Sequence, residues 1–392
     1  MPLPLYLLAL AVFAMGTSEF MLAGLLPDIA SDLDVTVGTA GTLTSAFAVG
    51  MVVGAPLVAA LARNWPARAT LLGFVLAFAA AHAVGAVTSS FPLLLASRVV
   101  AALANAGFLA VALTAVATLV PPDRTGRALG VLLSGTTVAT VAGVPGGAAL
   151  GTLLGWRASF WGVAVLCLPA ALGILRAVPA VRARGEATGR RALRAELAQL
   201  TRARVALVML LGALVNAATF ASLTFLAPVV THDAGLGELW ISVALVLFGA
   251  GSFVGVTVAG RLSDRRPGLV IAVGGPLLLV GWPALALLAE EPVALLVLVF
   301  VQGALSFAVG GTLMTRILYE AAGAPTMAGS YATAALNVGA AVGPALAAAT
   351  LGTGVGTLGP VWASGLLVAA ALITAFPLFT TVTGGGGAEA IR

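Results

Sequence analysis

The sequence has 392 residues and too few charges for a water-soluble protein of that length. Hydrophobic residues make up 60% of the chain and charged residues 8%, and the mean hydropathy is +1.12, whereas about a quarter of the residues of soluble domains are charged. This composition excludes a soluble globular protein and makes the lipid bilayer the solvent for most of the chain. The net charge of +5 is not arranged as a basic stripe with interleaved aromatic residues, so we expect no nucleic-acid partner.

Twelve apolar runs are each long enough to cross a bilayer, whose core of roughly 30 Å takes about 20 residues of helix. We expect helices at 5–27, 39–62, 69–89, 91–119, 126–154 and 157–178, and then at 205–230, 239–262, 268–289, 292–319, 326–352 and 357–380. The first run is not a convincing signal peptide, because no arginine precedes it and Glu19 lies inside it.

The arginines predict the orientation in the membrane. All 19 basic residues are arginines, and 17 of them fall in segments that a cytoplasmic N-terminus would place in the cytoplasm. Only Arg157 falls in an outer segment, and Arg98 lies within a span. Since cytoplasmic loops are enriched in basic residues, we expect both termini to be cytoplasmic.

The two halves of the chain repeat each other. An offset of 201 or 200 residues relates matching positions over three helices, which is typical of transporters built from parallel repeats of six helices. The matched positions are Gly50 with Gly251, Gly54 with Gly255, Leu61 with Leu262, Pro92 with Pro292, and Gly143 with Gly343.

This repeat predicts an all-α membrane protein of two pseudo-symmetric six-helix bundles. We expect an N-terminal bundle at 1–178, a cytoplasmic arginine-rich linker at 179–204, and a C-terminal bundle at 205–392 that ends in a short cytoplasmic tail.

Glu19 and Arg98 are the two ionisable residues that lie well inside predicted spans. Counted from Asp28 and Phe91 at the outer ends of their helices, both lie roughly 10–13 Å deep. Because a charge in hydrocarbon costs at least a few kcal/mol, each should face a partner or a wet cavity. A Glu19 whose exposure or distance to Arg98 changes during transport would bind and release a proton, whereas a permanent ion pair would only hold two helices together. Both interpretations remain open.

The fifth span contains an unusual concentration of glycines around a proline. Gly143, Pro145 and Gly147 are expected to form a bending segment that gates one side of a transport path, because small residues let helices approach closely and proline removes a backbone hydrogen bond. Ordinary tight helix packing is the alternative.

Uncharged polar residues recur on single helical faces and indicate a cavity lining. The alternative interpretation of these residues is that they hold helices together through hydrogen bonds. The candidate substrate-binding residues are Asn105, Asn216, Phe220, Gln302 and Asn337. His82 has no evident acidic partner in the sequence and His232 lies in an outer gap, where we expect it to be solvated, so neither is expected to have a role in proton transfer. We expect no metal site, since one cysteine, Cys167, and two histidines cannot supply a zinc site.

Several motifs resemble those of one transporter family. Gly260-Arg261-Leu262-Ser263-Asp264-Arg265 looks like the loop signature of the major facilitator superfamily, and Leu94-x-x-x-Arg98 resembles its fourth-helix motif. The Gly143–Gly147 region resembles the antiporter motif of its exporters, and the segments 15–30 and 155–160 are similar to the twelve-helix drug:proton antiporter branch. Arg63 stands where the first-half loop usually has an acidic residue, so Asp264 lacks a first-half counterpart.

The resemblance implies the major facilitator fold and proton-coupled efflux of small neutral, hydrophobic or amphipathic drugs, with chloramphenicol as the expected substrate. It associates Arg98 with proton coupling, the role that the depth argument gives to Glu19 as well, and it assigns gating to Asp264 and Arg265 as well as to the fifth span. The expected partners are drug, protons and lipid, with no cofactor beyond the proton gradient, in a monomer in the bacterial inner membrane.

Two alternatives stay open. A proton-coupled exporter of sugars or other metabolites would share the fold. An intramembrane enzyme or sensor is less favoured, because no Gly-x-Ser-x-Gly sequence or metal cluster is present. We therefore expect a secondary active transporter with no catalytic residues.

Overall fold

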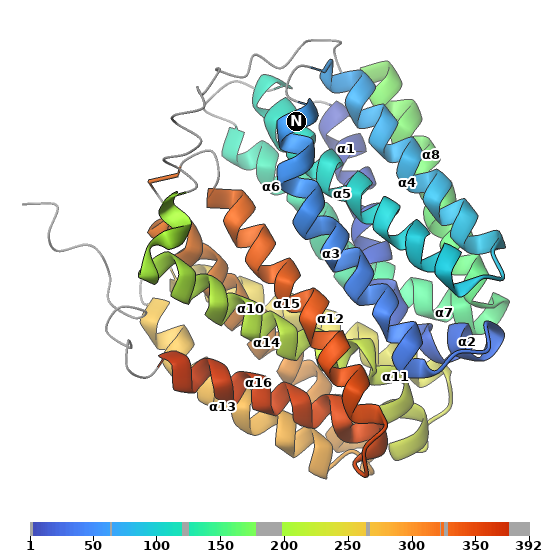
Figure 1. The fold of residues 1–392 in the computed structure, drawn as a ribbon, viewed down its shortest axis with the longest axis vertical. Helices are drawn as coiled ribbons and strands as arrows, with labels where there is room; N and C mark the ends of the chain where they lie inside the picture. The colour runs from blue at the N-terminus through green and yellow to red at the C-terminus, as the bar shows by residue number, and fades with distance from the viewer. Residues whose placement is uncertain are drawn as a thin grey trace, which may run out of the picture. The chain divides into compact units, whose positions relative to one another are not determined.

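The computed structural model describes residues 3–62, 65–119, 125–177, 198–263, 267–321, 323–324 and 328–375, and every regular element within them is a helix (Figure 1). Twelve helical stretches in this part of the chain are long and apolar enough to cross a membrane. The predicted all-helical class and the twelve spans are confirmed.

The first half of the chain contains six of these stretches, two of which are interrupted. Its elements are α1 (Leu3–Phe20), η1 (Met21–Gly24), α2 (Leu26–Asp32), α3 (Val37–Ala62), α4 (Ala67–Val87), α5 (Phe91–Leu119), α6 (Thr125–Val138), η3 (Ala139–Gly143), α7 (Val144–Leu154) and α8 (Trp156–Ala177).

The second half has the same order of long helices. Its elements are η4 (Ala198–Thr201), α10 (Ala203–Thr224), α11 (Leu226–Pro228), η5 (Val229–Asp233), α12 (Leu239–Ser263), α13 (Pro267–Leu287), α14 (Pro292–Glu320), α15 (Ala328–Leu351), η6 (Gly356–Leu358) and α16 (Gly359–Ala375).

Three predicted spans are less regular than expected. The α-helix of the first span ends at Phe20 and continues as the 3₁₀ turn η1, and that of the seventh span ends at Thr224. The fifth span contains the π-helical turn η3 immediately before Pro145. Proline has no N–H to donate to the preceding turn. The series of α-helical hydrogen bonds is therefore interrupted next to Pro145.

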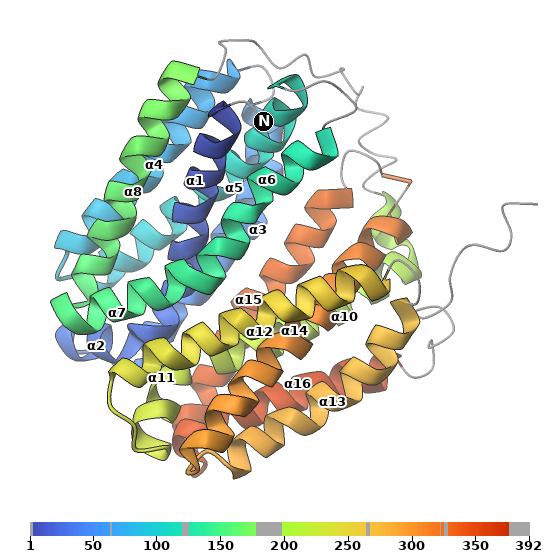
Figure 2. The ribbon, with the colours of Figure 1, turned by 180° about the vertical axis from the view of Figure 1, so that it is seen from behind.

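The chain divides into two compact units, Met1–Ala187 with Glu238–Val246, and Thr188–Gly237 with Leu247–Arg392. In the first unit α1 lies between α6 and α8, α3 packs against α5, and α4 packs against both α5 and α8 (Figure 2). In the second unit α10 packs against α14, α15 and α16, and α13 packs against α14 and α16. The predicted boundaries at 178 and 205 stay predictions, since residues 178–197 lie outside the described part of the chain.

The helix bounds fix the register of the repeat. The helices α5 and α14 each have 29 residues and begin 201 positions apart, whereas α4 and α13 each have 21 residues and begin 200 apart. Pro292 therefore matches Phe91 rather than Pro92, which corrects the pairing expected from the sequence. The contacts agree, because Gly54 faces Leu103 of α5 and Gly255 faces Ala304 of α14.

Candidate functional site

Glu19 and Arg98 lie in the first unit, near the end of α1 and in the second turn of α5. Arg98 is hydrogen-bonded to Ser18, the residue before Glu19, so the structure places the two residues that the sequence singles out in the same region of the first unit. The Arg98 side chain is 1% exposed, and Glu19 is half-buried. A fully buried guanidinium must have hydrogen-bond acceptors close by.

Those acceptors belong to Ser18 rather than to Glu19. Arg98 Nη1 donates to Ser18 Oγ over 2.7 Å, and Nη2 donates to the Ser18 carbonyl oxygen over 3.0 Å. The guanidinium carbon also lies 4.4 Å from the centre of the Phe47 ring, a favourable cation–π arrangement. Among the described residues no ion pair of 4 Å or less joins Arg98 to Glu19. Arg98 is therefore attached to Ser18, the residue that precedes Glu19, and is not bound to Glu19 itself.

His82 is the third member of this cluster. Its Nε2 lies 2.6 Å from Ser18 Oγ, and its Nδ1 lies 2.8 Å from the Phe78 carbonyl oxygen. The imidazole also stacks against Phe78 and Phe160, with ring centres 4.3 and 5.7 Å away. Sequence reasoning left His82 without a partner and did not select Ser18. The positions of Ser18 and His82 in the sequence give no signal of the contact between them. This contact exists only because α1 and α4 both reach Arg98.

The predicted gating residues of the fifth span lie against α1 and η1. A Cβ on Gly143 would overlap the Thr17 hydroxyl, and one on Gly147 would lie 3.3 Å from Met21 Cβ. Pro145 is buried in the first turn of α7. The π turn and these glycines thus lie along the helix that carries Glu19. The other two predicted gating residues, Asp264 and Arg265, lie outside the described residues.

The second unit contains a small, mainly apolar pocket. Its lining comprises Ser222, Leu223, Leu226, Phe248, Trp282, Leu285, Val299, Gln302 and Val361. Gln302 Nε2 donates to the Leu278 carbonyl oxygen over 3.3 Å, and the side-chain oxygen of Gln302 rests against Gly281. Among the described residues, Gln302 Oε1 and Trp282 Nε1 are buried with no hydrogen-bond partner. Two residues that line the pocket therefore carry one buried acceptor and one buried donor without a partner among the described residues.

Of the five predicted substrate-binding residues, Gln302 lines this pocket. Asn216 donates its amide N–H to the Leu336 carbonyl oxygen over 2.6 Å and so joins α10 to α15. Asn337 donates to Thr333 O in its own helix over 3.0 Å. Asn105 and Phe220 are buried in α5 and α10. Their roles in substrate binding stay predictions, and Trp282 is a pocket residue that sequence reasoning missed.

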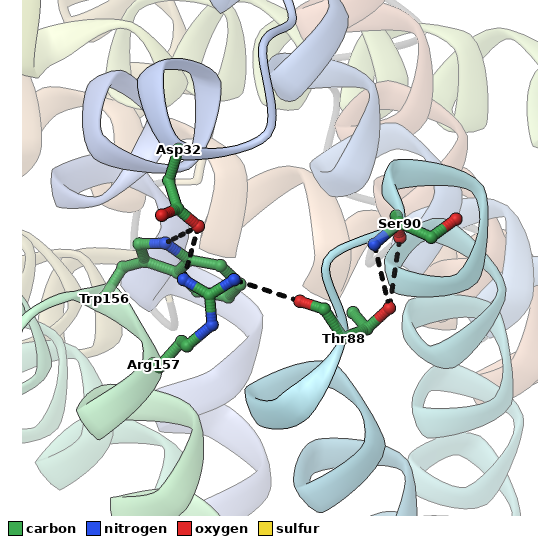
Figure 3. Close-up of polar contacts among 5 residues, drawn as sticks. All are labelled: Asp32, Thr88, Ser90, Trp156 and Arg157. Carbon is green, nitrogen blue, oxygen red and sulfur yellow. Dashed lines mark hydrogen bonds and ion pairs between the residues drawn. The ribbon is translucent and has the colours of Figure 1, made fainter.

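A polar cluster lies at one end of the first unit (Figure 3). Asp32 Oδ2 accepts hydrogen bonds from Trp156 Nε1, over 3.3 Å, and from Arg157 Nη1, with which it forms an ion pair. Arg157 also donates to the Thr88 carbonyl oxygen over 3.1 Å and lies over the Trp156 ring. The cluster joins α2 and α8 to the loop between α4 and α5.

Comparison with known proteins identifies relatives over the whole chain. Residues 8–335 match the family model described as Major Facilitator Superfamily. The chain is 78% identical over 392 residues to a protein of Streptomyces lividans named chloramphenicol resistance protein, with all of both chains covered. It is 32% identical over 353 residues to the inner membrane transport protein YdhP of Escherichia coli K12, which covers 90% of each chain.

A similar fold occurs among solved structures. A bacterial homologue of the human lysosomal transporter Spinster, in an inward-facing and unoccupied conformation, matches 97% of this chain and 96% of its own with a TM-score of 0.76. The sequence identity is 17%, so this likeness concerns the fold alone.

Proposed function

The chain belongs to the major facilitator superfamily and is a transporter of the bacterial inner membrane that crosses the bilayer many times; from this premise we propose that it exports small neutral amphipathic drugs, chloramphenicol among them, in exchange for protons. The observation that carries the proposal is the 78% identity to a chloramphenicol resistance protein over the full length of both chains. At that identity, substrate recognition is expected to be shared.

The pocket of the second unit supports a neutral substrate. Its walls are mainly apolar, and its unused polar atoms are the indole N–H of Trp282 and the amide oxygen of Gln302. Neutral drugs combine apolar surface with a few hydrogen-bonding groups, and sites for them are built in the same way. We assign part of the drug's contact with the second unit to these two residues.

The cluster around Arg98 supports coupling to protons. In our proposal Glu19 takes up a proton from the outer side, and the protein then opens to the cytoplasm, where Glu19 loses the proton. Arg98 is the charge that makes proton loss favourable, and its bonds to Ser18 keep it close to Glu19 in either state. No cofactor takes part, both termini are cytoplasmic, and one chain is sufficient.

The test uses purified protein in liposomes with an imposed pH gradient and labelled chloramphenicol. The wild type should accumulate drug against its concentration gradient only while the pH gradient lasts. Glu19→Gln should abolish this accumulation while still binding drug. Asp34→Asn is the matched control, because Asp34 is exposed and has a φ of 51° that asparagine tolerates.

The two parts of the proposal fail separately. A wild type that moves no chloramphenicol under any gradient would reject the substrate. Unchanged gradient-driven accumulation by Glu19→Gln would reject the coupling role of Glu19 and leave the substrate standing.

A further inference from the structure

Three hydrogen bonds in the first unit form a directed chain from α5 through α1 to α4. We propose that His82 is a positioning residue for Arg98: through the Ser18 hydroxyl it fixes the guanidinium at the end of α1, next to Glu19. The inference rests on the proposed function and concerns its proton-coupling step. It is carried by the contacts of His82, Ser18 and Arg98.

The donors and acceptors allow one arrangement of protons. Arg98 only donates, so Ser18 Oγ accepts from Nη1. The Phe78 carbonyl only accepts, so His82 Nδ1 carries a proton. The Ser18 hydroxyl then donates to His82 Nε2, which accepts as the bare nitrogen of a neutral imidazole. The Ser18 hydroxyl and both ring nitrogens of His82 are thus satisfied without a second cation beside Arg98, whereas Arg98 Nε is buried with no hydrogen-bond partner among the described residues.

The surroundings hold few other charges. Of the charged residues on the elements around His82, Arg98 of α5 belongs to this cluster, and Glu19 of α1 directly follows Ser18. The remaining charged side chains in the described parts of α4 and α8 lie towards the helix ends, and they are Arg68, Arg157, which is bound to Asp32, and Arg176. The orientation of the Ser18 hydroxyl is therefore decided by Arg98 and His82.

This orientation matters because Ser18 and Glu19 are adjacent. With His82 as acceptor, the Ser18 hydroxyl proton points away from Arg98 and an oxygen lone pair points towards it. Without that acceptor the hydroxyl is free to turn its proton elsewhere, as serines in helices do towards carbonyl oxygens of the preceding turn. Arg98 then loses a fixed partner and is free to pair directly with ionised Glu19. A closer guanidinium holds the ionised carboxylate more firmly, so Glu19 would take up a proton only at lower pH.

Three substitutions separate the hydrogen bond from the ring. His82→Gln places an amide near the position of Nε2 and keeps an acceptor for Ser18, whereas His82→Asn places it near Nδ1 and leaves Ser18 without one. His82→Phe keeps the stacking against Phe78 and Phe160 and removes both hydrogen bonds. We expect the Phe and Asn variants to lower kcat for gradient-driven export roughly tenfold, the effect of one lost bond to a charged group. Their pH profile should move to lower pH, with KM for the drug unchanged and both properties largely restored in the Gln variant.

A purely structural role would give a different result. If the Phe variant keeps the wild-type pH profile, or if the Asn and Gln variants behave alike, the positioning role is overturned. Ser18→Ala should reproduce the shifted profile, and adding His82→Phe to it should produce no further change, because both remove the same link.

A spectroscopic measurement decides the same point without any transport. The chain has two histidines, so His232→Asn leaves His82 as the single source of imidazole ¹⁵N resonances. We expect the spectrum of a neutral ring protonated at Nδ1 and a shift of the Nε2 resonance in Ser18→Ala. A ring protonated at Nε2, or no response to Ser18→Ala, would overturn the proposal. If the wild type moves no chloramphenicol, the proposed function fails. The spectrum would still decide whether the hydrogen bonds from Arg98 through Ser18 to His82 are formed.

Discussion

When the two units are aligned by their helix bounds, Val299 of the second unit corresponds to Arg98 of the first. The same alignment matches Phe47, which lies against the guanidinium, with Phe248, and matches His82 with Trp282. Phe248, Trp282 and Val299 all line the pocket of the second unit. One copy of the repeat thus holds a buried cation where the other has a pocket with unused hydrogen-bonding groups. In our proposal this difference separates proton coupling in the first unit from substrate recognition in the second.

The fifth helix of each unit differs in a second way. The first-unit helix is interrupted by the π turn η3, whereas α15 is one continuous α-helix over Ala328–Leu351 although it contains Pro344. Gly143 faces the side chain of Thr17, but its counterpart Gly343 faces the backbone carbonyl of Ala217. At this position the seam between the first and fifth spans of the second unit is closed by main-chain atoms, which cannot rotate away, whereas that of the first unit is closed by the Thr17 side chain, whose hydroxyl can rotate.

The largest expected effect concerns these two seams. Gly343→Ala should lower the free energy of unfolding by about 3 kcal/mol and Gly143→Ala by about 1 kcal/mol, since a packed interface tolerates an added methyl group only where a neighbour can move. Unfolding in detergent measures both. Gly310→Ala is the control, because a Cβ there meets nothing within 4 Å. Equal losses at Gly143 and Gly343 would show that the seams are equally rigid.

A smaller effect tests the division between coupling and recognition. Trp282→Phe keeps most of the ring in the pocket and removes the unused donor, so KM for chloramphenicol should rise roughly tenfold. The pH dependence of export should not move. Trp362→Phe, at a tryptophan 37% exposed on α16, is the matched control. A changed pH profile with constant KM would show that Trp282 acts in proton coupling. It would contradict the division between coupling in the first unit and substrate recognition in the second.

The smallest effect concerns equivalent acids near one end of each unit. Asp32 pairs with Arg157, whereas Asp233, 201 positions later, accepts a hydrogen bond from Thr357 over 2.7 Å. Asp32→Asn should cost about 1 kcal/mol, less at high salt because the pair is partly exposed. Asp233→Asn should cost about 0.5 kcal/mol at any salt concentration. Melting temperatures at low and high ionic strength distinguish the two, and the same salt dependence for both would contradict this assignment.

The sequence predicts the helices well because span length and hydropathy follow directly from the thickness of the bilayer. It also identifies Glu19 and Arg98, since a charge stands out in an apolar run. It does not predict the break after Phe20, because the break depends on how η1 packs against α7.

Uncharged site residues are harder to find in the sequence than charged ones. Ser18, His82 and Trp282 have ordinary neighbours in the sequence and gain their roles only from contacts between helices. The same limit applies to Asn216, whose amide joins α10 to α15, a contact that no spacing within one helix reveals.

The π turn over Ala139–Gly143 also has a geometric consequence for the rest of its helix. A π turn holds about one residue more than an α turn, and one residue corresponds to roughly 100° of rotation. Moving that extra residue along the helix, or removing it, would rotate every side chain between the old and new positions around the helix axis. Gly147 and Gly151 would then leave the surface formed by Met21 and Leu25. At the position of Gly151 the larger Leu150 or Thr152 would take its place, so shifting a single turn would switch this contact between a closely packed and a separated arrangement.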